Sequence, residues 1–274
     1  MSSNTELKRD CRTNTVTPKE YSPTLSVVIP AYNEVETISE IIRRVDETPI
    51  DLQIVIVDDG SSDGTAETIS KIAESNTACT ALFHSRNMGK GRAIRTALEQ
   101  CEGQYVLIQD ADLEYDPRDY NTVLAPLKNS QAHLVLGSRY LNSANRDRRI
   151  GLGSRIAVSI INSAMRLVYG VRLTDSATCY KACKTSWLKS VDLECERFEF
   201  CTEILAKGAR SGLQIKEVPI RYSPRTRYEG KKIGWRDGWF LLMAVFKWRN
   251  WNPPAAIRAT ADSESNSSLK QYDI

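Results

Sequence analysis

Unbroken apolar runs alternate along this chain with stretches in which apolar residues recur at helical spacing. Runs at residues 25–30 (LSVVIP), 53–57 (QIVIV) and 105–109 (YVLIQ) predict strands buried on both faces of a sheet. Weaker runs predict two further strands at residues 80–84 and 133–136. Strands that alternate with helices indicate a mostly parallel sheet with right-handed crossovers.

Two stretches carry a clear helical stripe. After the first strand, the apolar positions are Val35, Ile38, Ile41, Ile42 and Val45, and after the third they are Ala93, Ile94, Ala97, Leu98 and Cys101. Asn33, followed three residues later by Glu36, predicts a capping box at the start of the first of these helices. The turn DDGSSDG at residues 58–64 leads into another helix.

Composition narrows the class of protein. Residues 1–22 and 252–274 are polar and lack periodicity, so we expect a disordered lead and tail around one domain at 23–251. A net charge of +3 gives no basis for a nucleic-acid partner. Seven cysteines form no regular framework, and Cys179 and Cys183 lack the partners of a zinc site, so a reducing, cytoplasmic setting is expected.

Polar side chains follow several of the predicted strands. Residues 32–34 come after the first strand, 58–59 after the second, and Asp110 and Asp112 after the fourth. In parallel sheets, ligands bind at the carboxyl ends of the strands. Asp110 and Asp112 are separated by one residue, so both carboxylates lie on one side of an extended chain. They repel each other unless a cation lies between them. This favours a hard divalent cation bound together with a nucleotide diphosphate. The alternative is a chance Asp-x-Asp pair in a loop.

Five segments together resemble family-two glycosyltransferases with the GT-A fold: VVIPAYNE, VIVDDGSSDGT, NMGKGRAIRTAL, LIQDADLEYDP and LVLGSRY. Three later segments, TDSATCYKA, EFCTEI and EVPIRYSPRTRYEGKKIGWRDG, are similar to the dolichol- or polyprenyl-phosphate mannosyltransferase branch. The resemblance spans residues 25–239. It implies a Rossmann-like α/β domain, with a central, mostly parallel sheet flanked by helices.

The resemblance implies that residues after the first two strands hold the nucleotide base: Pro30, Tyr32, Glu34, Val57 and Asp59. Tyr32 offers a flat face for stacking, and the Glu34 carboxylate can accept hydrogen bonds from base N–H groups. The alternative is that these residues only begin a helix and form a glycine turn.

The resemblance also implies a diphosphate site at Asp110, Ala111 and Asp112, with Mg²⁺ or Mn²⁺ held by the two aspartates and mainly by Asp112. Glu114 is a candidate for a further contact to the metal. Arg139 resembles the family arginine that binds phosphate, because a guanidinium offers paired donors. The alternative for Arg139 is an ordinary surface residue.

A basic segment at residues 225–232 completes the predicted site. In the family, an arginine and a later lysine hold the diphosphate and the acceptor phosphate. The sequence leaves open whether Arg225 or Arg227 is that arginine; the distance to Gly230 favours Arg227, and Lys232 aligns with the lysine. The alternatives are a solvated basic loop and a patch that faces anionic lipid.

The expected activity is inverting, metal-dependent transfer of a hexose, with mannose from GDP-mannose favoured, to a dolichyl or polyprenyl phosphate. UDP-glucose, UDP-N-acetylglucosamine, a soluble hydroxyl acceptor and a non-catalytic nucleotide-sugar-binding scaffold remain as alternatives. A phosphate acceptor is already anionic near neutral pH and needs no base. We therefore expect Asp175 and Glu203 to position cations.

Two apolar segments, residues 150–171 and 235–251, resemble the interface helices of the family. Tryptophan and basic residues suit the headgroup layer of a membrane, which predicts peripheral contact with its cytoplasmic face. The alternative is that both are ordinary core helices. No segment reaches the roughly 20 apolar residues that span a bilayer.

Overall fold

The computed structural model describes residues 23–142, 151–225 and 235–255. Residues 1–22 and most of the predicted tail at 252–274 lie outside these ranges. The strands are β1 Leu25–Ala31, β2 Leu52–Asp58, β3 Cys79–Phe83, β4 Tyr105–Ile108, β5 Leu134–Ser138, β6 Lys181–Lys184 and β7 Ile215–Pro219. The helices are α1 Ile38–Asp46, α2 Thr65–Ser75, α3 Lys90–Gln100, η1 Pro117–Asp119, α4 Tyr120–Lys128, α5 Leu152–Tyr169, α6 Thr185–Ser190, α7 Phe200–Arg210 and α8 Trp235–Lys247.

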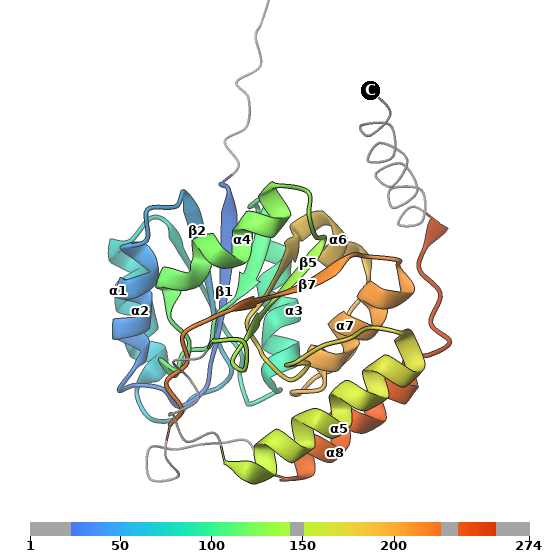
Figure 1. Ribbon diagram of the computed structural model, residues 1–274. Coiled ribbons are helices and arrows are strands. Elements are labelled where there is room, and N and C mark those ends of the chain that lie inside the picture. Colours follow the sequence, from blue (N-terminus) through green and yellow to red (C-terminus); the bar gives the residue numbers. More distant parts are fainter. Residues whose placement is uncertain (1–22, 143–150, 226–234, 256–274) are drawn as a thin grey trace, which may run out of the picture.

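One sheet with the strand order β3-β2-β1-β4-β6-β5-β7 forms the centre of the molecule (Figure 1). All five predicted strands are present, with bounds shifted by up to two residues. Strand β6 is antiparallel to both of its neighbours, and the other pairings are parallel. The mostly parallel α/β sheet expected from the sequence is therefore confirmed.

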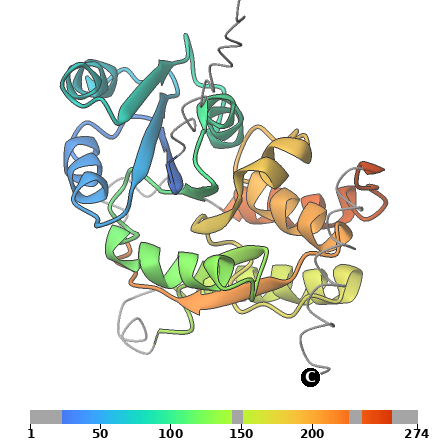
Figure 2. The same ribbon diagram turned by 90° about the horizontal axis from the view of Figure 1, so that it is seen from above.

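Helices cover the sheet and bury its apolar runs. Strand β2 is fully buried at Ile54, Val55, Ile56 and Val57, which explains why its sequence is unbroken rather than alternating. Helix α3 packs against β1 and β2, while α4 packs against the strands at the other end of the sheet. Both views place α1 and α2 beside the β1–β3 half (Figures 1 and 2).

The capping box predicted for Asn33 and Glu36 is wrong. Helix α1 begins at Ile38, with Thr37 at its N-cap position. Asn33 instead adopts a left-handed backbone conformation, with φ of 50°, and its side-chain oxygen accepts a hydrogen bond from the Ser62 backbone N–H. A polar residue suited to a cap therefore ties the end of β1 to the turn that follows β2.

Helices α5 and α8 lie side by side along one side of the domain (Figure 1). The Tyr169 hydroxyl at the end of α5 donates a 2.6 Å hydrogen bond to the Val245 carbonyl of α8. The inner face of α5 is buried at Val158, Ile161 and Met165. In the part of the chain that the structure describes, no helix is long and apolar enough to cross a bilayer.

Candidate active site

Four parallel strands end at one edge of the sheet and bring the predicted segments together. Pro30 of β1 pairs in register with Val57 of β2, and Ala31 pairs with Asp58. Val28 pairs with Ile108, so the residues that follow β4 lie beside the end of β1. Strand β5 has the same direction, because β6 runs antiparallel to both β4 and β5.

Asp59 organises the segment that leads into α3. Its two carboxylate oxygens accept hydrogen bonds from the backbone N–H groups of Met88 (2.9 Å) and Gly89 (2.7 Å), and His84 Nδ1 lies 2.7 Å from Oδ1. Gly89 has φ of +97°, and a Cβ there would lie 2.4 Å from the Glu196 carbonyl oxygen. The structure thus gives Asp59 a positioning role, while its predicted contact with a base stays a prediction.

Asp59 and this glycine place Lys90, the first residue of α3, against Asp110. Lys90 Nζ lies 2.5 Å from Asp110 Oδ1 and 3.2 Å from Cys179 Sγ. Burial alone would lower the pKa of Lys90, but the charge of Asp110 raises it above its usual value. The cation beside Asp110 is therefore a side chain of the protein. Lys90 lies within a segment that carries the family resemblance, but its sequence pattern does not predict this role.

Asp112 lies in an environment that favours a bound cation. Burial, and next the charges of Asp110 and Glu114, raise the pKa of Asp112 to about 7. Its Oδ1 atom accepts a hydrogen bond from the Glu114 backbone N–H. Carboxylate oxygens with excess negative charge suit Mg²⁺ or Mn²⁺, so the donor chemistry fits the predicted metal.

Within the described ranges, no group of three acidic, histidine or cysteine side chains converges on a ligand set. This agrees with the chemistry of Mg²⁺, which keeps several waters and binds through one or two carboxylates and substrate phosphates. Asp112 is the residue that would hold the metal. The pairing of Asp110 with Lys90 makes Asp110 the weaker of the two predicted ligands.

Glu114 anchors the segment that follows β7. Its carboxylate accepts hydrogen bonds from the Tyr222 hydroxyl (2.9 Å) and the Arg225 backbone N–H (2.8 Å). The Arg225 guanidinium crosses to the end of β1, where it donates to Glu34 Oε2 (2.8 Å) and Thr37 Oγ1 (3.1 Å). Arg225 therefore lies at the predicted base-binding segment. Arg227 and Lys232 lie outside the described residues, so the choice between the two arginines stays open.

Arg139 is held by a buried carboxylate. Its Nε and Nη2 atoms donate to the two oxygens of Asp175, each at 2.7 Å, and its backbone N–H donates to Asp175 Oδ2. Asp175 is fully buried, and the Arg139 guanidinium lies 5.3 Å from the centre of the Tyr222 ring. Asp175 thus positions Arg139. Glu203 is also fully buried and pairs with Lys207 at 2.8 Å.

These contacts form one connected assembly across the strand ends. Glu34 binds Arg225, Arg225 binds Glu114, Glu114 binds Tyr222, Tyr222 lies against Arg139, and Arg139 binds Asp175. Tyr32 is 37% exposed, which leaves part of its ring accessible. Pro30 is half-buried, while Val57 and Ala111 are buried, so their side chains shape the site rather than offer polar atoms.

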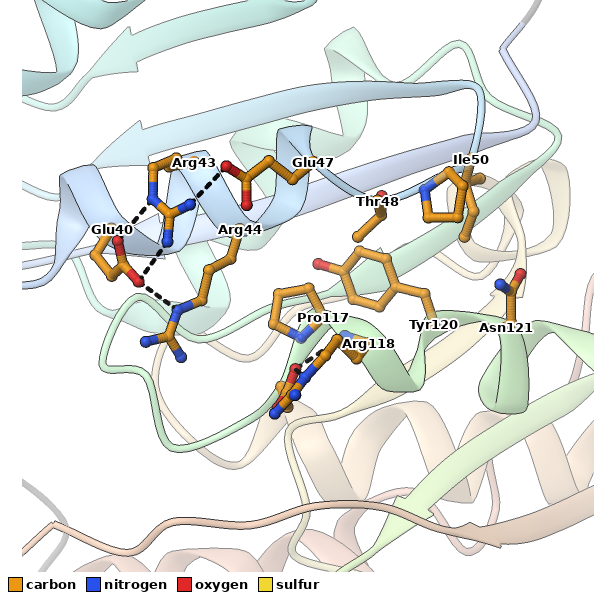
Figure 3. Close-up of a pocket in the computed structure, with 12 residues that line it drawn as sticks. Glu40, Arg43, Arg44, Glu47, Thr48, Ile50, Pro117, Arg118, Tyr120 and Asn121 are labelled. Atoms are coloured by element: carbon orange, nitrogen blue, oxygen red, sulfur yellow. Dashed lines mark hydrogen bonds and ion pairs between the residues drawn. The ribbon is translucent and has the colours of Figure 1, made fainter.

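A separate groove of about 520 Å³ lies between α1 and residues 116–121 (Figure 3). Its arginines already have carboxylate partners: Arg43 and Arg44 pair with Glu40, and Arg118 pairs with Asp116. This balanced arrangement differs from that at Asp112, where carboxylates gather. The strand-end assembly is therefore the better candidate for a metal–diphosphate ligand.

A mostly parallel α/β sheet, with acidic and cationic side chains gathered at its strand ends, is the arrangement that the GT-A class of nucleotide-sugar-binding folds has. The sequence profile of the family described as "Glycosyl transferase family 2" matches residues 26–191. The chain belongs to this family.

Two curated relatives extend the comparison. Undecaprenyl-phosphate 4-deoxy-4-formamido-L-arabinose transferase of Edwardsiella ictaluri is 30% identical over 213 residues, which cover 76% of this chain and 62% of that protein. Low-salt glycan biosynthesis hexosyltransferase Agl6 of Haloferax volcanii is 29% identical over 82% of this chain. The match spans 54% of Agl6, so this chain corresponds to about half of that relative's length.

Solved structures share the fold. Glucosyl-3-phosphoglycerate synthase of Mycobacterium tuberculosis, in complex with Mn²⁺, UDP and phosphoglyceric acid, superposes with a TM-score of 0.61 at 21% identity, covering 85% of this chain and 80% of that chain. The mannosyltransferase PcManGT of Pyrobaculum calidifontis, in complex with GDP-Man and Mn²⁺, gives a TM-score of 0.53 at 19% identity, covering 93% and 77%.

Proposed function

We propose that this chain catalyses inverting transfer of a hexose from a nucleotide sugar to a polyprenyl phosphate, with Mg²⁺ or Mn²⁺. The observation that carries the proposal is the strand-end assembly, in which Asp112 lies beside the carboxylates of Asp110 and Glu114 and Arg139 is held on the same sheet edge. Membership of glycosyl transferase family 2 supports the reaction type, and the undecaprenyl-phosphate relative supports the acceptor.

Each part of the assembly has a chemical role in this proposal. Tyr32 and Glu34 bind the base, and Asp112 holds the metal. When bound, the metal neutralises charge on the leaving diphosphate. Arg139 donates hydrogen bonds to phosphate oxygens, and Asp175 keeps its guanidinium oriented. The basic segment that contains Arg227 and Lys232 binds the diphosphate and the acceptor phosphate.

The acceptor phosphate supplies the nucleophile. Its second pKa is near 6, so its oxygen is already anionic at neutral pH and no protein base is needed. Attack opposite the leaving group forms the new bond to the anomeric carbon as the bond to the diphosphate breaks. An α-linked donor therefore gives a β-linked product.

GDP-mannose is the favoured donor, with UDP-glucose or UDP-N-acetylglucosamine as the alternatives. Both base types occur among the structural neighbours, one of which was solved with UDP and the other with GDP-Man. The phosphoglyceric acid bound to the first neighbour keeps a soluble phosphate-bearing acceptor as the second candidate for this chain.

Product analysis of the purified chain tests the proposal. Each donor is incubated with Mn²⁺ and a polyprenyl phosphate, and separately with 3-phosphoglycerate and with a neutral oligosaccharide. We expect glycosyl transfer to the polyprenyl phosphate from one donor, abolished by EDTA and restored by Mn²⁺. Transfer to a soluble acceptor alone would overturn the lipid assignment, and the absence of transfer with every pair would favour a nucleotide-sugar-binding scaffold.

The outer faces of α5 and α8 fit contact with a membrane surface. On α5, Ile156, Ile160 and Leu167 recur on one face and are 53%, 51% and 84% exposed. On α8, Trp239 and Met243 are 59% and 48% exposed. Exposed apolar side chains of this kind suit insertion into the headgroup layer, where the lipid acceptor presents its phosphate.

We expect Leu167→Glu combined with Trp239→Glu to lower binding to vesicles of anionic and zwitterionic phospholipid at least tenfold. Removing apolar area and adding charge both oppose insertion. Vesicle sedimentation measures the change. Phe83→Glu, at a 50% exposed apolar position on β3, is the matched control and should leave vesicle binding unchanged. Equal loss in both variants would contradict a specific membrane face.

A further inference from the structure

Two buried thiols that the proposed reaction does not use meet beside the candidate active site. Cys179, which precedes β6, and Cys201, in the first turn of α7, have their Sγ atoms 3.8 Å apart. Cys179 is 4% exposed and Cys201 is 1% exposed. Strand β6 and helix α6 lie between the two residues in the sequence, so this proximity is a product of the fold.

The pair is coupled to the site through one ammonium group. Lys90 Nζ lies between Asp110 Oδ1 at 2.5 Å and Cys179 Sγ at 3.2 Å. The Lys90 ammonium thus has two neighbouring acceptors, Asp110 and Cys179. A change in the position or chemistry of Cys179 Sγ therefore alters the surroundings of the ammonium that neutralises Asp110. The Lys90 and Asp110 side chains are 14% and 12% exposed.

The surroundings make the two thiols chemically unequal. Burial alone would raise the pKa of Cys201, but the hydrogen bond from Cys179, followed by the charges of Lys181 and Lys90, lowers it to about 7. The same contact and burial raise the pKa of Cys179. Two adjacent thiols of unequal acidity, one of them in the first turn of a helix, resemble the arrangement of redox-active cysteine pairs.

We infer that Cys179 and Cys201 form a reversible disulfide that disturbs the Lys90–Asp110 contact and slows transfer; the second effect rests on the proposed function. A hydroperoxide is the oxidant. The Cys201 thiolate attacks hydrogen peroxide to give a sulfenic acid and hydroxide, and Cys179 sulfur then displaces water from the Cys201 sulfur. Overall, two thiols lose two electrons and two protons, and one peroxide becomes two waters.

Bond formation requires a local movement that reaches Lys90. The sulfur atoms must approach from 3.8 Å to about 2.05 Å, and the oxidised Cys179 no longer carries a thiol beside the ammonium. Lys90 contacts both Cys179 and Asp110. A movement of Cys179 Sγ therefore alters the position of the ammonium group that pairs with Asp110 at the end of β4. Asp110 and Asp112 share this strand end, so oxidation affects the surroundings of the candidate metal ligand.

Peptide mapping and activity together test the inference on the full chain. The reduced protein is treated with hydrogen peroxide, alkylated under denaturing conditions and digested without reductant. We expect a cross-linked peptide that contains Cys179 and Cys201, and at least a fivefold loss of transfer, both reversed by dithiothreitol. After the same peroxide treatment, Cys201→Ser should keep its activity and should form no cross-link to Cys179. Cys183→Ser, at another buried cysteine, should behave like the wild type.

The outcomes separate this inference from the proposed function. Absence of the cross-link in wild type, or equal peroxide sensitivity of Cys201→Ser, overturns the redox pair. A cross-link that leaves transfer unchanged overturns its effect on the site. If the reduced protein transfers no sugar at all, the proposed function fails, while the peptide map still decides whether the disulfide forms.

Discussion

Asp112→Asn is expected to lower sugar transfer by about 10²–10³-fold while making the folded protein more stable at alkaline pH. Under the proposed function, Asp112 holds the metal that neutralises the leaving diphosphate, and the substitution removes the charge of this ligand. The asparagine amide keeps the size of the side chain and retains an oxygen atom. The change therefore tests charge at this position rather than packing.

The gain in stability follows from the direction of the pKa shift. The pKa of Asp112 rises from 3.8 to about 7 on folding, because burial and the charges of Asp110 and Glu114 disfavour its ionised form. Below pH 3.8 the Asp112 carboxyl is protonated in both the folded and the unfolded state, and its contribution to stability is complete. This contribution is lost as the pH rises through 7, because the carboxyl then ionises in the folded protein. An amide does not ionise, so the variant should gain about 2 kcal/mol over the wild type at pH 8, after allowance for partial exposure.

Urea unfolding at pH 4 and at pH 8, in EDTA, measures this difference, which should be small at pH 4 and large at pH 8. In Mn²⁺ with the nucleotide diphosphate of the active donor, wild type should gain stability and Asp112→Asn should not. Arg118→Ala, in the groove of Figure 3, is a control for a charge change outside the site. A variant that keeps metal-dependent transfer would contradict the assignment of Asp112.

The sequence predicted the parts of this site whose signals are local. The runs at 25–30, 53–57 and 105–109 are apolar because helices cover both faces of the sheet, and the polar residues directly after them mark the strand ends. Position along a parallel strand then suffices to bring 32–34, 58–59 and 110–112 to one edge. For these segments, fold and site follow from the same pattern.

The remaining parts depend on contacts with no local signal. Strand β6 has the sequence KACK, which lacks an apolar run, yet Lys181 is buried because its ammonium donates to the Thr178 carbonyl. Lys90 reaches Asp110 across 20 residues, and Arg139 reaches Asp175 across 36. Ion pairs of this range are set by how helices and loops pack on the sheet, so sequence patterns identify the residues but not their partners.

Asp175→Asn is expected to lower both stability and transfer, and a matched variant separates the two effects. Removing one charge of a buried pair leaves the Arg139 guanidinium uncompensated and should reduce the free energy of unfolding by about 3 kcal/mol. It also replaces one of the two acceptor oxygens that orient the guanidinium with an NH₂ group that cannot accept, so we expect about 10²-fold slower transfer.

Glu203→Gln provides the comparison, because Glu203 is equally buried but pairs with Lys207 rather than with Arg139. It should lose similar stability in urea unfolding and keep transfer within about twofold when both variants are assayed well below their melting temperatures. If the two variants lose transfer to the same extent, Asp175 contributes only to folding. If only Asp175→Asn loses transfer, the buried carboxylate acts through the orientation of Arg139. The guanidinium proposed to bind phosphate then works only when Asp175 holds it in place.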